Sequence, residues 1–148
     1  SDVNTVLPSQ SSAPASLHER ISLDLAKSYE VDDLISDPSG PDLVIRQGSR
    51  IAFVEVKTGS PNLPLPSSTV AQMNMLTVHA KKKVDPTQGV EIVPVLVTNY
   101  QVSPADRQEL GDQGIKIVEV SSGKSVYNST DLVKNFSNIV GFQHEKLV

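Results

Sequence analysis

The feature that most constrains this chain is residues 50–58, RIAFVEVKT, which have the pattern of a β-strand. Side chains alternate across a strand, so Glu55 and Lys57 share one face with Ile51 and Phe53, while Ala52, Val54 and Val56 share the other. Both faces are largely apolar, which is typical of a strand covered on both sides. A carboxylate and an ammonium on the inner face of such a strand need an explanation beyond packing.

A second carboxylate is predicted to lie beside this pair. The segments DLVIR (42–46) and RIAFVEVKT are joined by QGS, which is a hairpin signal. The start of the first hairpin strand lies opposite the end of the second, so Asp42 and Glu55 are expected to converge, with Lys57 beside them. The strand end is therefore a candidate active site.

Two carboxylates at one point are costly unless a cation neutralises them. The chain has no Cys, so a hard, oxygen-loving cation is favoured: Mg²⁺, with Mn²⁺ as a substitute. Asp42 and Glu55 are the candidate metal ligands, and the backbone carbonyl of Val56 lies between them as a further one. Lys57 is placed to orient an attacking water and to offset charge on a phosphate.

The rest of the chain predicts an α/β domain. The predicted elements are a helix at 17–29, a short strand at 31–36, the hairpin strands at 42–46 and 50–58, a Pro-rich loop at 59–68, a helix at 69–83, a strand at 90–99, a helix at 103–111 and a strand at 114–120. Residues 1–15, rich in Ser and Pro, are expected to be a flexible tail or linker. Residues 16–120 form the predicted core, and residues 121–148 a C-terminal extension with one helix near 130–136 and a frayed end.

Composition limits the partners. A chain of 148 residues is enough for one domain with a core of its own. No apolar run approaches the ~20 residues that span a membrane, and the first residues lack a secretory signal, so we expect a cytoplasmic, nucleoid-associated protein with no membrane partner. The net charge of −4 gives no global attraction to nucleic acid, so a polyanion would need a local basic patch.

The residues that mark this site also carry a family resemblance. Pro41-Asp42, twelve intervening residues and then Glu55-Val56-Lys57 resemble the signature of the PD-(D/E)XK nuclease superfamily. The order helix, three-strand meander, helix, strand, helix, strand is similar to their restriction-endonuclease-like core, a central mixed sheet flanked by helices. Residues 94–120 further resemble Mrr-type restriction endonucleases and archaeal Holliday junction resolvases. The resemblance covers residues 17–120 and implies hydrolysis of DNA phosphodiester bonds with Mg²⁺, leaving a 5′-phosphate.

Two further site residues follow from the resemblance. The family places an acidic residue on the first helix near the metal, and Glu19 is the position that matches. Its direction falls inside the apolar arc of the predicted helix, which suits a carboxylate turned toward the sheet. The alternative is a capping box with Ser16. A Gln on the helix after the loop often lies near the active site in the family, which favours Gln72.

The basic residues offer candidate phosphate contacts. Lys81, Lys82 and Lys83 form the only basic run in the chain, and with His79 they are candidates for nucleic-acid binding. The alternative is a solvated helix end stabilised through the helix dipole.

Two other features of the sequence narrow the possible functions. His18 and His144 have no partners at metal-ligand spacing and are expected to be structural or surface residues. Three Phe and three Tyr give no aromatic stacking platform, so sequence-tolerant binding of single-stranded RNA is not favoured.

Three functions remain open. The first is a Mg²⁺-dependent DNA endonuclease, a nuclease module of a larger protein or system in which other domains or subunits supply DNA binding. The second is a Holliday junction resolvase, which would act as a homodimer because two strands are cut across a two-fold junction. The acidic composition weighs against it. The third is a noncatalytic nucleic-acid-binding or assembly module, whose usual mark is loss of the acidic or lysine positions, and all of these are present.

Overall fold

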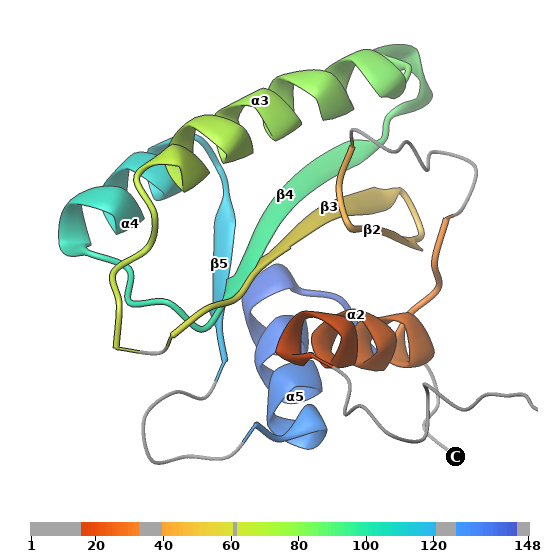
Figure 1. Cartoon of the computed structure of the whole chain (residues 1–148). Coiled ribbons are helices and arrows are strands. Elements are labelled where there is room, and N and C mark those ends of the chain that lie inside the picture. The colour runs from red at the N-terminus through yellow and green to blue at the C-terminus, as the bar shows by residue number, and fades with distance from the viewer. Residues whose placement is uncertain (1–15, 33–39, 61, 121–126, 145–148) are drawn as a thin grey trace, which may run out of the picture.

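The computed structural model describes residues 16–32, 40–60, 62–120 and 127–144. In these residues a four-stranded mixed sheet lies between two layers of helices (Figure 1). The strands are β2 (Leu43–Gln47), β3 (Arg50–Lys57), β4 (Glu91–Thr98) and β5 (Lys116–Glu119). The helices are α2 (Leu17–Ser28), α3 (Ser68–Lys83), α4 (Pro104–Asp112) and α5 (Ser129–Val140), with a 3₁₀ turn at Pro86–Gln88. The predicted α/β class, a mixed sheet flanked by helices, is confirmed.

The sheet has the order β2-β3-β4-β5. β2 and β3 are antiparallel, with register from Leu43 opposite Val54 to Gln47 opposite Arg50, and Gly48 gives their turn its positive φ of 61°. β3, β4 and β5 run parallel. A parallel pair needs a crossover, and α3 and α4 supply the two crossovers.

The predicted short strand at 31–36 is described only at its start. Val31 forms an antiparallel bridge with Ile45, and the Asp32 N–H donates to the Val44 carbonyl at 2.8 Å. The described start of this segment therefore pairs with β2. Residues 33–36 and the predicted tail at 1–15 lie outside the described residues.

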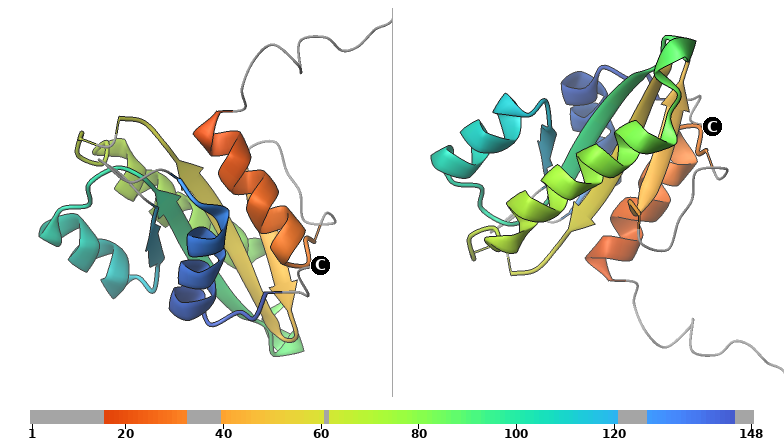
Figure 2. Two further views of the ribbon diagram at one scale, coloured as in Figure 1. Left: turned by 90° about the horizontal axis from the view of Figure 1, so that it is seen from below. Right: turned by 90° about the horizontal axis from the view of Figure 1, so that it is seen from above.

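The two faces of the sheet bury separate cores, as the apolar pattern of β3 predicts. Ala52, Val54 and Val56 pack with α2 and α5, whereas Ile51 and Phe53 pack with α3 and α4. Figure 2 shows α3 crossing one face, and α2 and α5 side by side on the other. Each fully buried aliphatic or aromatic side chain contributes about 1.5–3 kcal/mol, so β3 is held rigidly from both sides.

The C-terminal segment belongs to the core that lies under α2 and α5. Its helix, predicted near 130–136, is α5, which ends at Gly141 in the left-handed conformation. Phe136 and Phe142 are fully buried, and Arg50 donates to the carbonyls of Gly141 and Val140 at 3.0 and 2.9 Å. Phe142 and the hydrogen bonds between Gln143 and Gln47 anchor the chain after the helix. Residues 121–126 and 145–148, with the rest of the expected frayed end, lie outside the described residues. None of the described helices is long and apolar enough to cross a membrane.

Candidate active site

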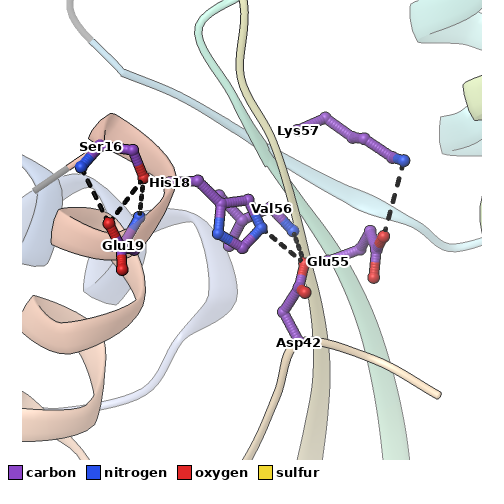
Figure 3. Close-up of polar contacts among 7 residues, drawn as sticks. All are labelled: Ser16, His18, Glu19, Asp42, Glu55, Val56 and Lys57. Carbon is purple, nitrogen blue, oxygen red and sulfur yellow. Dashed lines mark hydrogen bonds and ion pairs between the residues drawn. The ribbon is translucent and has the colours of Figure 1, made fainter. Parts of the chain in front are cut away.

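Asp42, Glu55 and Lys57 lie at the same end of the β2–β3 hairpin (Figure 3). Leu43 pairs with Val54, so one further step of the register sets Asp42 opposite Glu55. Directly opposite side chains on an antiparallel pair share one face and lie close together. The structure thus brings the two predicted carboxylates together through the register of the hairpin.

The carboxylate of Asp42 is fixed by two donors. Its Oδ2 accepts a hydrogen bond from the Val56 N–H at 2.8 Å, and the same oxygen lies 3.3 Å from Nε2 of His18. Two steps beyond the last ladder pair, Pro41 would face Val56, and proline has no N–H to donate to the Val56 carbonyl. The Asp42 side chain accepts the Val56 N–H. Because N–H and C=O of one strand residue point to the same side, the Val56 carbonyl also faces this edge.

Glu55 and Lys57 form a loose ion pair that is partly shielded from water. Nζ of Lys57 lies 3.8 Å from Oε2 of Glu55, with side-chain exposures of 30% and 22%. Burial, and then the charge of Asp42, raise the pKa of Glu55, while Lys57 acts in the opposite direction. The distance of 3.8 Å is that of an ion pair and exceeds hydrogen-bond length. Burial and the charge of Asp42 both disfavour the ionised form of Glu55, and a second cation beside it would favour that form.

A pocket of about 450 Å³ opens beside this pair. α3 packs across β3, and its residues Gln72, Met75 and His79 project one turn apart along one side. The pocket is lined by Gly40, Glu55, Lys57, Gln72, Met75, Leu76 and His79. The sequence-predicted residues Gln72 and His79 therefore join Glu55 and Lys57 in one pocket.

The lysine run lies apart from this pocket. Lys81, Lys82 and Lys83 are exposed in the last turn of α3 and are absent from the pocket lining. Their position at a helix C-terminus fits the dipole alternative. It also leaves them within about one turn of His79.

Glu19 does not face the two carboxylates. Its N–H donates to Ser16 Oγ at 3.1 Å, and its Oε1 accepts from the Ser16 N–H at 3.0 Å. The hydrogen bonds that the N–H and the hydroxyl of Ser16 donate to this carboxylate lower the pKa of Glu19, and the side chain is exposed. The capping-box alternative is confirmed, and the expectation that Glu19 turns toward the sheet is wrong, because a capping box folds this side chain back onto Ser16 (Figure 3).

His18 takes the place beside Asp42 that was expected for Glu19. This contact of His18 was not predicted from the sequence, because histidines were considered only at metal-ligand spacing. A signal was present: His18, Ile21 and Leu25 recur at helical spacing, and Ile21 and Leu25 are fully buried against the sheet. His144 is exposed, as expected, and lines a groove between α2 and α5.

The chain leaving β3 is clamped immediately after Lys57. The Asn99 side chain accepts from the Gly59 N–H at 2.9 Å and donates to the Gly59 carbonyl at 2.7 Å. Further along, Gln101 exchanges backbone hydrogen bonds with Leu63 and Leu65 at 3.0 and 2.8 Å. The predicted loop at 59–68 is thus tied to the end of β4, which keeps the strand end that carries Lys57 in place.

The donor set fits a hard cation with few protein ligands. In the part of the chain that the structure describes, no three His, Cys, Asp or Glu side chains form a metal-binding group. Two carboxylates and one carbonyl remain available at the strand end. Mg²⁺ is commonly held through one or two carboxylates and keeps several waters, so the residues present suit this ion.

Comparison with known proteins returned no match to a family model, a curated protein or a solved structure. An α/β fold hosts many chemistries, so the fold class by itself assigns no function. The functional argument therefore rests on the residues and the geometry of the site.

Proposed function

We propose that this protein is a Mg²⁺-dependent DNA endonuclease of the PD-(D/E)XK type, with a restriction-endonuclease-like core, that works as a module of a larger protein or system. One observation carries the proposal. Asp42 and Glu55 lie opposite each other at the end of a rigid hairpin, with Lys57 3.8 Å from Glu55 on the wall of a pocket. The order of helix, hairpin, helix, parallel strand, helix and parallel strand supports the same assignment.

Asp42, Glu55 and the Val56 carbonyl would hold the metal. Oδ2 of Asp42 is already engaged by the Val56 N–H and His18, so Oδ1 would be the oxygen that binds the cation. The cation supplies Lewis-acid chemistry: it polarises a phosphoryl oxygen and neutralises charge on the phosphate. The raised pKa of Glu55, caused by burial and by the charge of Asp42, supports this, since a cation there would favour the ionised carboxylate.

The remaining side chains act on the substrate. Hydrolysis adds a water oxygen to phosphorus and breaks the bond from phosphorus to the 3′ oxygen of the sugar. The products are a 5′-phosphate and a 3′-hydroxyl that takes up the proton released by the water. The Lys57 ammonium offsets the negative charge that builds on the phosphate oxygens, and the Gln72 amide, with one donor and one acceptor group, orients the water or the phosphate.

DNA is held by local contacts, because the chain as a whole carries a net charge of −4. His79 lines the pocket, and Lys81, Lys82 and Lys83 continue along α3 toward its C-terminus. These residues contact the phosphates that flank the cleaved bond. Further affinity comes from domains or subunits attached to this one.

A cleavage assay tests the proposal. Purified protein is incubated with supercoiled, linear, single-stranded and four-way-junction DNA in Mg²⁺, Mn²⁺ or EDTA. Cutting is expected with either metal and not in EDTA. Lys57→Ala should lower the rate by about 10²–10³-fold, whereas the matched variant Lys116→Ala, which removes an exposed lysine on β5, should cut at the wild-type rate.

Two results would overturn the proposal. One is cutting that persists in EDTA or in Lys57→Ala, which would place the activity elsewhere. The other is no cutting of any substrate, together with Mn²⁺ binding that is the same in wild type and in Asp42→Asn. A preference for four-way junctions, shown by a protein that is dimeric in solution, would select the resolvase form of the same chemistry.

A further inference from the structure

One wall of the pocket is apolar and open to solvent. Met75 is 72% exposed, the highest value among the large apolar side chains of the described residues, and it lines the pocket together with Glu55 and Lys57. Leu76 lies behind it and is almost fully buried. A pocket of about 450 Å³ is therefore lined both by charged and polar side chains and by an exposed aliphatic side chain.

Phosphodiester chemistry makes no use of such a wall. A phosphate, a hydrated cation and an attacking water all require polar partners, which Glu55, Lys57 and Gln72 provide. An exposed methionine gains free energy when it meets an apolar surface in a complex. In a nucleic acid, the largest apolar surface within one residue of a phosphate is the face of a base.

The face of a base becomes available only when it leaves the stack. In a paired duplex the neighbouring bases cover it, and only the base edges are reached from the grooves. Proteins usually receive an unstacked base on an aromatic ring. All six aromatic residues of the chain are engaged elsewhere. Phe53, Phe136 and Phe142 are buried in the cores, Tyr29 is buried beside Phe136, Tyr127 donates to Asp24, and Tyr100 lies against Gly59.

We propose that this pocket accepts a nucleotide whose base is unpaired, and that Met75 contacts the face of that base. Met75 is then a specificity-determining residue, and the preferred substrate is DNA that is single-stranded, gapped or mismatched at the cleaved bond. A thioether suits this task because it is flexible and polarisable and contacts any base. The inference rests on the proposed nuclease function.

The test compares two exposed residues of α3. Met75 lines the pocket, and Val78, 55% exposed, does not. Cleavage rates are measured on a fully paired duplex and on the same duplex with a three-nucleotide gap. Wild type should cut the gapped substrate faster than the paired one. Met75→Ala should lower the ratio of these two rates about tenfold, and Val78→Ala should leave the ratio unchanged. Both side chains are exposed, and thermal melts monitored by circular dichroism check that both variants fold.

Binding gives a readout that does not need cleavage. In a Lys57→Ala background with Mg²⁺, the anisotropy of labelled gapped and paired DNA reports affinity. Adding Met75→Ala should weaken binding to the gapped duplex and leave the paired duplex unchanged. Equal preference for both substrates in wild type, or equal effects of Met75→Ala and Val78→Ala, would overturn the inference while leaving the nuclease standing. Met75-dependent binding of gapped DNA without metal-dependent cutting by wild type would support this inference and remove the nuclease.

Discussion

Gly59→Ala should destabilise the end of β3 by a steric conflict that the structure defines. A Cβ built at Gly59 would lie 1.9 Å from the Tyr100 hydroxyl oxygen, 2.3 Å from Cζ and 2.7 Å from Cε1. The backbone cannot retreat freely, because the Asn99 side chain bonds both the N–H and the carbonyl of Gly59. Tyr100 must therefore swing out of its half-buried position or the Asn99 clamp must open.

The expected loss is about 1–3 kcal/mol, the usual cost of forcing extra atoms into a packed site. With a urea m-value of about 1–3 kcal/mol/M, the unfolding midpoint should fall by about 1 M. Gly111→Ala is the matched control: it lies in α4 with no atom within 4 Å of the added Cβ, so it should be neutral or stabilise by about 0.5–1 kcal/mol through helix propensity.

Removing the Tyr100 ring tests whether the steric conflict causes the loss of stability. In a Tyr100→Ala background, Gly59→Ala should cost much less than in the wild-type chain, giving a coupling energy of at least about 1 kcal/mol between the two sites. Unchanged midpoints for Gly59→Ala, or equal losses with and without the Tyr100 ring, would refute the steric explanation.

Three further predictions concern the site itself. The pKa of Glu55 is raised above its ordinary value of 4.5 in the folded chain. Above pH 4.5 the folded chain therefore keeps the carboxyl proton of Glu55 where the unfolded chain has released it. The free energy of unfolding falls as the pH rises from 4.5 through the raised pKa. Glu55→Gln should therefore be more stable than wild type at pH 7 and lose this advantage as pH falls toward 4.5; identical urea midpoints at pH 7 would contradict it. Ser16→Ala, which breaks the capping box with Glu19, should cost about 1 kcal/mol and leave the Mg²⁺ dependence of cleavage unchanged, whereas a shifted Mg²⁺ dependence would restore Glu19 to the metal site. His18→Ala should raise the Mg²⁺ concentration for half-maximal cleavage by about 10–100-fold, because His18 holds Asp42 in place; an unshifted Mg²⁺ titration would show that the contact is incidental.

The hairpin and its carboxylates could be predicted from the sequence because they depend on local rules. The period of two assigns Glu55 and Lys57 to one face, and QGS joins two adjacent strands, which fixes their register. Asp42 then falls opposite Glu55 without any long-range information. Gln72 was instead predicted from the family resemblance, and it lies on α3, which covers this face because a connection between parallel strands must cross the sheet.

The first helix shows where such rules stop. Its length and its N-cap Ser16 followed from the sequence, but the direction of Glu19 did not. A hydrogen bond of about 1 kcal/mol turns that carboxylate back to the helix end, and His18, one residue earlier, reaches Asp42 instead. Helical periodicity distinguishes faces about 100° wide, which is too coarse to choose between neighbouring residues.

The C-terminal helix was underestimated for a different reason. Its first turn, Ser129 to Asp131, is polar and reads as part of a turn, and its docking depends on contacts about ninety residues away. Arg50 caps the helix end and stacks 5.0 Å above the Phe142 ring. No local pattern connects a residue in a hairpin with a phenylalanine near the end of the chain.

The central proposal is that Asp42 and Glu55 hold a divalent cation that the protein requires to cut DNA. The most direct measurement is the rate at which the protein nicks supercoiled plasmid as a function of Mg²⁺ concentration, for wild type and for Asp42→Asn. The account predicts a rate that rises with Mg²⁺, saturates, and vanishes in EDTA, with Asp42→Asn inactive at every concentration. Nicking by Asp42→Asn at the wild-type rate and with the same Mg²⁺ dependence would contradict it.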